Sequence, residues 1–294
     1  MATTSSSDSV AQPRLLLLSS GVRDHDWACA QLGDDAWLLT CSGEETLLGA
    51  AIEDMELRWG RPDRVVPLDG RCIELAGHVR AALGLPAPAT ESAPALRDRR
   101  EMHRRAVAAG LPTVQLLERG ALEDWDFRTP VIAKPVAHDA PGTRRLTSSY
   151  DLADLDPAAD MLFEEWVTAP VCHVDGIAVD GRIVAAQLFY YVGSGRVAVT
   201  GERALARLTA AASDVVAGLD LPDGAFHIEL FDLPTNPMLL DVVVPRAVAR
   251  TPAEAPESRS RAKTCVAARA PQRVRQTLVA EVKLVRRAFR LTAA

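Results

Sequence analysis

The alternation of short apolar segments with helical patterns in the first third of the chain constrains the fold most. Each apolar segment is typical of a buried strand, and a segment with helical periodicity follows it. The segments are, in order, Arg14–Ser20, Asp24–Leu32, Ala36–Cys41, Glu44–Met55, Arg64–Pro67 and Asp69–Leu83. Because strands joined through helices pair in parallel, the pattern predicts a small parallel α/β domain. No G-x-G-x-x-G follows the first strand, so nothing here indicates dinucleotide binding.

A different pattern follows a linker marked by Pro86, Pro88 and Pro94. Its strands follow one another through turns, and Asp180-Gly181 is a strong hairpin signal. The expected helices are Ala95–Ala109, Tyr150–Leu155 and Glu202–Gly218, and the expected strands are Val131–Ala133, Met161–Val167, Cys172–Val179, Arg182–Tyr191, Phe226–Phe231 and Met238–Val244. The expected hairpins pair Cys172–Val179 with Arg182–Tyr191 and Phe226–Phe231 with Met238–Val244.

One lysine stands out in this second part. The chain has 33 lysines and arginines, but only Lys134, Lys263 and Lys283 are lysines. Lysine carries a compact charge on a thin stem, whereas arginine carries a wide planar fork. Lys134 follows an apolar strand and precedes a polar loop, His138–Arg145, with Gly142-Thr143 at its tip. A strand that delivers a lysine beside a small-residue loop predicts a phosphate grip; the alternative is an ordinary surface lysine.

Composition excludes several classes of protein. A chain of 294 residues can form two domains, and 48% hydrophobic with 24% charged residues is typical of a globular protein. No apolar segment approaches the roughly 20 residues that span a bilayer, and no secretory signal is recognisable. We therefore expect a cytoplasmic protein. Five cysteines, an odd number with no Cys-x-x-Cys pair, argue against a disulfide framework or a zinc site.

The charge is distributed unevenly. From Arg246 onward there are 12 Lys/Arg and three Asp/Glu, a charge of +9. The preceding 245 residues carry 21 Lys/Arg and 36 Asp/Glu, a charge of −15. Residues 247–270 have no periodicity, and Arg273–Arg290 carries an apolar stripe at helical spacing. Such a basic helix can bind nucleic acid or a membrane surface. We expect instead that it docks on the acidic body of its own chain or of a second copy.

Histidines could also assist catalysis. His138, His173 and His227 all lie in the second part of the chain. Histidine can transfer protons near neutral pH, so each is a candidate. Three histidines scattered along a chain are more often satisfied structural residues, and we expect a structural role.

Several stretches together resemble the signatures of the ATP-grasp superfamily over roughly residues 14–246. Their order and spacing match the family's, including its "K-P", "v-E-e" and "G-x-f-h-x-E" motifs. The matching stretches are Arg97-Asp98-Arg99 with Ala108-Ala109-Gly110-Leu111-Pro112, Lys134-Pro135 with Gly142-Thr143-Arg144-Arg145, Phe163-Glu164-Glu165-Trp166-Val167, Val174-Asp175-Gly176 with Asp180-Gly181-Arg182-Ile183-Val184, and Gly224-Ala225-Phe226-His227-Ile228-Glu229. The resemblance implies an N-terminal parallel α/β domain followed by an ATP-grasp domain of two α+β subdomains.

The resemblance also implies cofactors and site residues. ATP needs cations at its phosphates, a backbone hinge at adenine, and carboxylates that hold Mg²⁺. The implied roles are phosphate contacts for Arg99 and Lys134, a flexible lid for Gly142 and Thr143, an adenine hinge for Glu164, Glu165, Trp166 and Val167, magnesium ligands for Glu229 and Asp241, and catalysis at the acyl phosphate or γ-phosphate for Arg246 and Lys134.

The chain departs from the family pattern in two places before its last strand. The family lysine after the aspartate is Arg99 here, which keeps the charge but changes the shape of the group. The hinge normally continues "G-x-E", whose glutamate binds ribose, and this chain has Ala169-Pro170-Val171 there. Both changes affect groups that would touch the nucleotide.

The last strand departs further. The family reads "E-x-N-x-R" here, and alignment on Arg246 puts Val242 and Val244 at the glutamate and asparagine positions. Asp241 is one residue away, so in a regular strand it points to the opposite face. A β-bulge next to Pro245 would turn it back toward the site.

Two functions stay open from the sequence. The first is an ATP-dependent ligase that joins a carboxylate to an amine through an acyl phosphate, on small molecules or a peptide, with specialised metabolism as one setting. The second is a non-catalytic ATP-grasp-like protein that binds a nucleotide or metabolite or supports a catalytic partner. The expected organisation is a disordered leader 1–13, a parallel α/β domain 14–93, an ATP-grasp domain 94–246 with its hinge near 164–167, a linker 247–270 and a basic helix 271–294. We expect no nucleic-acid or membrane partner; a homodimer or a partner enzyme is compatible with the tail.

Overall fold

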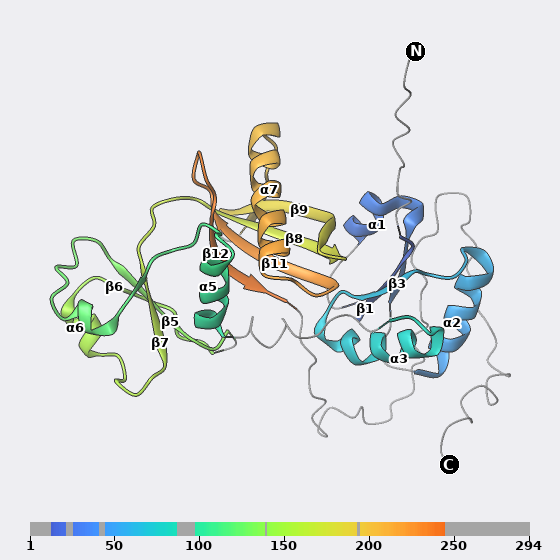
Figure 1. Cartoon of the computed structure of the whole chain (residues 1–294), viewed down its shortest axis with the longest axis horizontal. Coiled ribbons are helices and arrows are strands. Elements are labelled where there is room, and N and C mark those ends of the chain that lie inside the picture. The colour runs from blue at the N-terminus through green and yellow to red at the C-terminus, as the bar shows by residue number, and fades with distance from the viewer. Residues whose placement is uncertain are drawn as a thin grey trace. The chain divides into compact units, whose positions relative to one another are not determined.

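A computed structural model describes residues 13–21, 26–40, 45–86, 98–138, 140–192 and 195–244. These residues divide into two compact units, one ending before residue 88 and one extending from there to residue 246 (Figure 1). The expected linker 247–270 and basic helix 271–294 lie outside the described residues, as does all but the last residue of the leader. The expected domain boundaries stay predictions.

The first unit is the parallel α/β structure that the sequence predicts. Its strands pair in parallel in the order β2-β1-β3, and all five residues of β1 are buried. The elements are β1 (Leu15–Ser19), α1 (Asp26–Leu32), a 3₁₀ turn (Gly33–Asp35), β2 (Ala36–Thr40), α2 (Glu45–Arg58), β3 (Arg64–Pro67), a 3₁₀ turn (Gly70–Cys72) and α3 (Ile73–Leu83). A central strand covered on both faces explains the unbroken leucine run, since parallel sheets bury both faces.

The expected helix Asp69–Leu83 begins differently from the prediction. Asp69 accepts a hydrogen bond from the backbone N–H of Arg71 at 3.0 Å and so caps a 3₁₀ turn. The α-helix proper starts at Ile73 and ends at Gly84, which has a positive φ of 63°. Aspartate as a cap and glycine as a stop are the usual signals, and here a short 3₁₀ turn separates the cap from the α-helix.

The second unit consists of two antiparallel sheets with helices. One sheet has the order β4-β7-β5-β6 and the other β10-β9-β8-β11-β12. The elements are α5 (Arg99–Ala108), β4 (Leu116–Leu117), a 3₁₀ turn (Arg119–Leu122), β5 (Val131–Pro135), β6 (Arg144–Leu146), α6 (Ser149–Ala153), β7 (Met161–Glu165), β8 (Val171–Val179), β9 (Arg182–Val192), β10 (Gly195–Ala198), α7 (Glu202–Gly218), β11 (Gly224–Phe231) and β12 (Met238–Val243). The predicted α/β fold with an α+β second unit is confirmed.

Helix α7 covers one face of the five-stranded sheet. It contacts β8, β9 and β11, and its buried residues Leu208, Ala212 and Val215 form a stripe at helical spacing. The stripe packs in one core with strand residues such as Val174 and Ile228. Since side chains alternate along a strand, the residues between these core positions face the other side of the sheet. That other side carries the polar residues described below.

Helix α5 begins later than the sequence predicts. The side chain of Asp98 accepts a hydrogen bond from the backbone N–H of Glu101 at 2.9 Å, so Asp98 is the N-cap and Arg99 the first helical residue. Asp98 also forms a β-bridge with Ala137, which holds it in extended conformation. The end agrees with the prediction, because Gly110 has a positive φ of 72° just after the helix.

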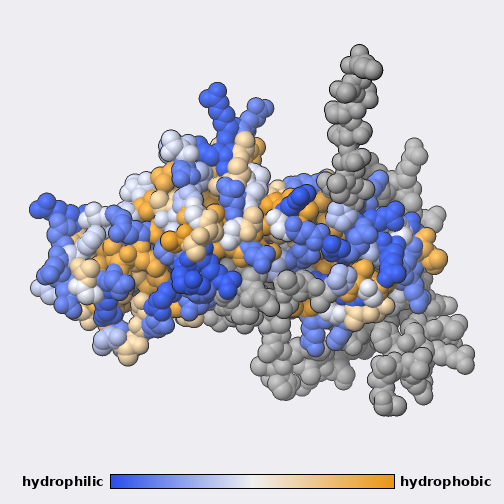
Figure 2. All heavy atoms as spheres, in the orientation of Figure 1, coloured by the Kyte–Doolittle hydropathy of each residue, from blue (hydrophilic) through white to orange (hydrophobic). Residues whose placement is uncertain are grey.

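The surface of the described residues is mixed. Figure 2 shows hydrophilic and hydrophobic residues interspersed over the visible face of both units. Single apolar residues on a surface are normal. None of the described helices is long and apolar enough to cross a bilayer.

Candidate functional site

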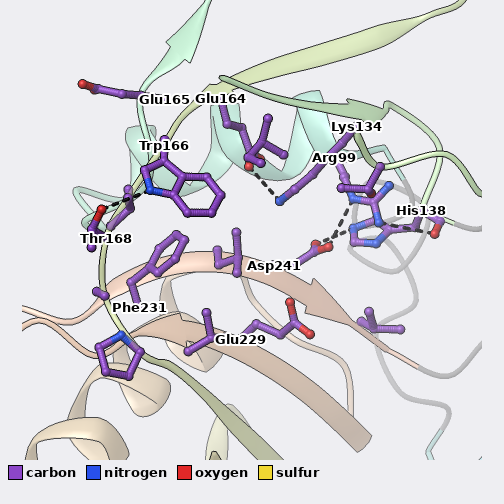
Figure 3. Close-up of a pocket in the computed structure, with 18 of the residues that line it drawn as sticks. Arg99, Lys134, His138, Glu164, Glu165, Trp166, Thr168, Glu229, Phe231 and Asp241 are labelled. Carbon is purple, nitrogen blue, oxygen red and sulfur yellow. Dashed lines mark hydrogen bonds and ion pairs between the residues drawn. The ribbon is translucent and has the colours of Figure 1, made fainter. Parts of the chain in front are cut away.

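The second unit contains a cavity of about 900 Å³ (Figure 3). Side chains of β5 and β7 line one wall, and side chains of β11 and β12 line the opposite wall. Residues 166–170, which connect β7 to β8, line it as well. The volume lies in the range of small-molecule and cofactor sites.

Lys134 lies in the wall formed by the four-stranded sheet. Its neighbours Val131 and Ala133 belong to the core on one face of β5, so Ile132 and Lys134 face the cavity. The Nζ of Lys134 lies 2.7 Å from Oε2 of Glu164, and both side chains are at most 10% exposed. Burial raises the pKa of the Glu164 carboxyl, and the charge of Lys134 opposes that rise. Lys134 is therefore not an ordinary surface lysine; its phosphate contact stays a prediction.

Glu164 lies apart from the expected hinge. Its backbone is inside the sheet, paired with Leu116 on one side and Ile132 on the other, so it cannot pair with a base there. The expected strand Met161–Val167 ends at Glu165, because the chain then leaves this sheet and enters the other one at Val171.

The segment 166–170 is the part that fits a hinge. It belongs to neither sheet and lines the cavity. The Trp166 Nε1–H donates to Thr168 Oγ1 at 3.0 Å, and the Arg145 guanidinium lies 4.5 Å from the centroid of the Trp166 ring. The Glu165 side chain points away from the cavity (Figure 3). Trp166 and Val167 thus lie where the sequence predicts, and their contact with adenine is untested.

The two residues expected in the lid differ in position. Thr143 lines the cavity, whereas Gly142 does not contribute to its lining. Gly142 has a positive φ of 121°, a conformation that only glycine adopts readily. Glycine is therefore needed there for the path of the loop just before β6.

The opposite wall carries a square of four polar residues on β8 and β11. His173 lies opposite Glu229 in the antiparallel ladder, and Asp175 lies opposite His227. The His227 ring is 2.6 Å from Asp175 through Nδ1 and 3.4 Å from Glu229 through Nε2. His173 Nδ1 lies 3.3 Å from both Glu229 Oε1 and His227 Nε2. Strand pairing thus brings together His173 and His227, which lie far apart in the sequence, and the expected structural role of the histidines stays a prediction.

The charges in this square shift two pKa values. Burial alone would lower the pKa of His227, but its hydrogen bonds to Asp175 and Glu229 outweigh burial and raise the pKa to about 9. Burial would raise the pKa of Glu229, but its contacts with His173 and His227 outweigh burial and lower it well below the usual range. Glu229 is therefore an ionised carboxylate at neutral pH.

Asp241 also faces the cavity, because β12 contains a bulge. Glu229 pairs with Asp241 and Leu230 pairs with Leu239, so Leu240 is an extra residue in β12. Leu239 and Val242 both lie in the core, which strict alternation would forbid, and Asp241 between them lines the cavity. The expectation that Asp241 points away in a regular strand is wrong. The bulge that turns it inward is at Leu240, and Pro245, where we expected one, lies outside the described residues.

Asp241 lies against two basic side chains, Arg99 and His138. Arg99 Nε donates to Asp241 Oδ2 at 3.1 Å, and its Nη1 donates to the backbone oxygens of Pro135 and Ala137 at 2.8 and 3.1 Å. His138 Nε2 lies 3.0 Å from Asp241 Oδ1, but neither ring nitrogen of His138 has a well-aligned hydrogen bond among the described residues. Burial lowers the pKa of His138, although Asp241 opposes this. Arg99 thus ties β12 to the end of β5.

Comparisons with known proteins identify the fold. No family model matches the sequence, and no curated protein matches it. The structure is similar to N5-carboxyaminoimidazole ribonucleotide synthetase from Thermotoga maritima, with a TM-score of 0.50 and 15% identity over 80% of this chain and 69% of that one. The chain has the ATP-grasp fold. Two other similar structures are the RimK domain protein ATP-grasp from Sphaerobacter thermophilus (TM-score 0.47, 17% identity, 78% and 90% of the two chains) and D-alanine–D-alanine ligase from Bacillus anthracis complexed with ATP (0.47, 13%, 79% and 86%).

The structure shows which residues of the last strand face the cavity. Alignment on Arg246 selects Val242 and Val244, but both pack in the core behind the sheet. The cavity face carries Asp241 and Val243 instead. Asp241 is therefore the residue of this strand that offers a carboxylate to the cavity, and Val243 offers it no polar group. Arg246 itself lies outside the described residues, so its role stays a prediction.

Sequence reasoning left some residues around this cavity without a role. Val171, part of the departure from the hinge pattern, lines the cavity and offers no polar side-chain group. Asp175 was assigned no role, although it holds His227. The signal was present as His173-x-Asp175 and His227-x-Glu229, two polar pairs with the spacing of two that shares a strand face.

Proposed function

We propose that the second unit binds ATP in its cavity and that the protein is an ATP-dependent ligase that joins a carboxylate to an amine. The observation that carries the proposal is that basic side chains and carboxylates line the same cavity. Lys134 and Arg99 line one part of the cavity, and the carboxylates Glu229 and Asp241 face it from β11 and β12. Phosphoryl transfer depends on cations and carboxylate-bound metal placed around the phosphates.

The residues suggest how ATP would lie. The triphosphate would lie near Lys134 and Thr143, which contribute a cation and a hydroxyl to the cavity wall. The adenine would lie against residues 166–170, where backbone groups belong to no sheet and Trp166 offers an aromatic surface. A location in the cytoplasm, where ATP is available, fits this role.

Magnesium fits the carboxylate pair. Glu229 and Asp241 are directly opposite each other on adjacent strands, and Mg²⁺ is usually held by one or two carboxylates together with phosphate oxygens. When bound, Mg²⁺ would neutralise phosphate charge. The charged side chains that face the cavity, histidines aside, are the cations Arg99 and Lys134 and the carboxylates Glu164, Glu229 and Asp241. An excess of carboxylates repels free ATP, so nucleotide binding should require the metal ion.

The proposed reaction has two steps. A substrate carboxylate oxygen attacks the γ-phosphorus of ATP, which forms an acyl phosphate and releases ADP. An amine nitrogen then attacks the acyl carbon, loses a proton and displaces phosphate, which forms an amide. Lys134 would hold transferring phosphate oxygens, and Arg246 is the expected second cation. The substrates would be small molecules or a peptide.

Calorimetry with ATP, with and without Mg²⁺, tests the binding step. We expect binding only with Mg²⁺, and a loss of at least about tenfold in affinity, roughly 1.4 kcal/mol, for Glu229→Gln. The exposed Glu123→Gln is a matched control that should bind like the unmodified protein. Phosphate release measured over a panel of carboxylates and amines then tests the ligase step. Equal ATP binding with and without Mg²⁺ would contradict the assignment of the carboxylate pair.

Two observations favour a second candidate, a non-catalytic nucleotide-binding or metabolite-binding protein. The cavity face of β12 carries Val243 where an amide is expected, and Asp241 is already paired with Arg99. Both features weaken the grip on a second metal ion. Mg²⁺-dependent ATP binding without phosphate release for any substrate pair would favour this candidate over the ligase.

A further inference from the structure

Three ligand atoms on the sheet wall form a nearly equilateral triangle. The distances are 3.3 Å from His173 Nδ1 to His227 Nε2, 3.3 Å from His173 Nδ1 to Glu229 Oε1, and 3.4 Å from His227 Nε2 to Glu229 Oε1. Zinc binds imidazole nitrogen and carboxylate oxygen at about 2.0–2.2 Å, so neighbouring ligands in a tetrahedral zinc site are about 3.3–3.5 Å apart. The triangle therefore matches one face of a zinc tetrahedron.

We propose that His173, His227 and Glu229 bind a divalent transition-metal ion of the zinc type. These residues are the cluster of possible metal ligands found among the described residues. Two histidines and one glutamate with a fourth position left open is a ligand set that zinc uses. The ion would lie at the wall of the cavity, because His227 and Glu229 line it.

The donor atoms select against magnesium. Mg²⁺ requires oxygen ligands in a near-octahedral arrangement, whereas imidazole suits zinc, copper, iron and nickel. Two of the three donors here are imidazole nitrogens. The site is thus distinct in chemistry from the magnesium site proposed at Glu229 and Asp241, although the two share Glu229.

Hydrogen bonding alone accounts poorly for the triangle. Charge-assisted hydrogen bonds between imidazolium and carboxylate are about 2.7–2.9 Å long. The distances from His173 and His227 to Glu229 are 3.3 and 3.4 Å, whereas the distance from His227 to Asp175 is 2.6 Å. His227 therefore makes its strong hydrogen bond on the Asp175 side and leaves Nε2 toward the centre of the triangle.

The neighbours of the histidines hold them in the binding orientation. Asp175 accepts from Nδ1 of His227, so Nε2 is the nitrogen that would release its proton to solvent and bind the ion, as in zinc sites where a carboxylate orients the ligand histidine. The His173 ring stacks on Phe189, with centroids 5.5 Å apart and planes 10° apart, and meets the edge of Tyr191 at 4.3 Å. His173 is buried. Ligands that are fixed before the ion arrives bind it more tightly.

The test is metal binding by the purified full-length chain after treatment with a chelator. Titration with Co²⁺ should produce the strong visible absorption of a four-coordinate ion at one equivalent, Zn²⁺ should abolish it, and a large excess of Mg²⁺ should not. Because loss of an outer-shell partner costs about 10–100-fold in affinity, Asp175→Asn should weaken binding by that amount and His173→Ala by more. His227→Gln gives an independent variant at a partly exposed ligand. His78→Ala, which changes an exposed histidine in the first unit, is the control and should bind like the unmodified chain.

The outcomes separate this inference from the proposed function. Asp241→Asn should weaken Mg²⁺-dependent ATP binding and leave the Co²⁺ spectrum unchanged, so either proposal can fail alone. Absence of Co²⁺ absorption in the full chain would overturn the metal site. Absorption that survives in both His173→Ala and His227→Gln would overturn it equally, because the ion would then be bound elsewhere.

Discussion

Removal of the Lys134 charge should destabilise the second unit, because it leaves a buried carboxylate alone. Lys134 and Glu164 are 2.7 Å apart with side chains 10% and 7% exposed. Breaking a buried pair by removing one partner costs about 3–5 kcal/mol. Glu164 can escape by taking up a proton, which at pH 7 costs roughly 3.7 kcal/mol for an ordinary glutamate. Burial raises the pKa of Glu164, so the cost of protonation is lower than that.

The expected loss for Lys134→Met is therefore at most about 4 kcal/mol. With a urea dependence of about 2 kcal/mol per molar, the unfolding midpoint should fall by up to roughly 2 M. The double variant Lys134→Met with Glu164→Gln removes both charges and should recover most of the loss, since replacing a whole buried pair is often neutral. Urea unfolding of the four proteins of this cycle measures the coupling directly.

The same variants separate the ion pair from the phosphate grip. If Lys134 contacts phosphate, ATP affinity should fall at least about tenfold in the double variant even though its stability is restored. Unchanged stability of Lys134→Met would refute the buried pair. A double variant that binds ATP as the unmodified protein does would refute the phosphate contact.

Two further predictions concern residues outside the cavity. Gly176→Ala should lower the free energy of unfolding by about 1–3 kcal/mol, because the new methyl group would lie 2.2 Å from the Phe226 ring. Gly77→Ala in α3 meets open space and should raise the free energy of unfolding by up to about 1 kcal/mol. Urea unfolding of the two variants compares these effects. Cys172 should resist alkylation at pH 8 in the native state, because burial raises the pKa of its thiol to about 12. The partly exposed Cys29 should react, and peptide mass spectrometry distinguishes the two residues. Rapid labelling of Cys172 would show that the sheet opens.

Regular elements could be predicted from the sequence because their signals are local. Helix Glu202–Gly218 and strand Arg64–Pro67 are found with the predicted bounds. The turn Asp180-Gly181 is also confirmed, with positive φ at both residues. Spacings of 3.6 and 2 together with turn residues determine such elements, and no distant contact has to be known.

The face of the sheet on which the Asp241 side chain lies could not be predicted, because it depends on a β-bulge. A run of apolar residues, Met238 to Leu240, gives no sign of which residue is extra. The extra residue is fixed by which partners on β11 are core residues, namely Ile228 and Leu230. That is a tertiary constraint, and periodicity within one strand does not contain it.

The square of polar residues on β8 and β11 could not be predicted for a similar reason. His173 and His227 are 54 positions apart, and only the register of β8 on β11 brings them together. The short strand β10 was missed because Gly195–Ala198 has no apolar alternation and all four residues are exposed. It forms by pairing with the end of β9, so its neighbour determines it more than its own sequence does.

The bulge at Leu240 also affects how related chains should be aligned. Pairing is regular on both sides of it, so a chain without this residue would keep Asp241 opposite Glu229 and Leu239 opposite Leu230. Insertions and deletions at this position therefore leave the carboxylates in place. In a sequence alignment, a gap should be placed at Leu240. Residue spacing counted across Leu240 does not show which side chains share the cavity.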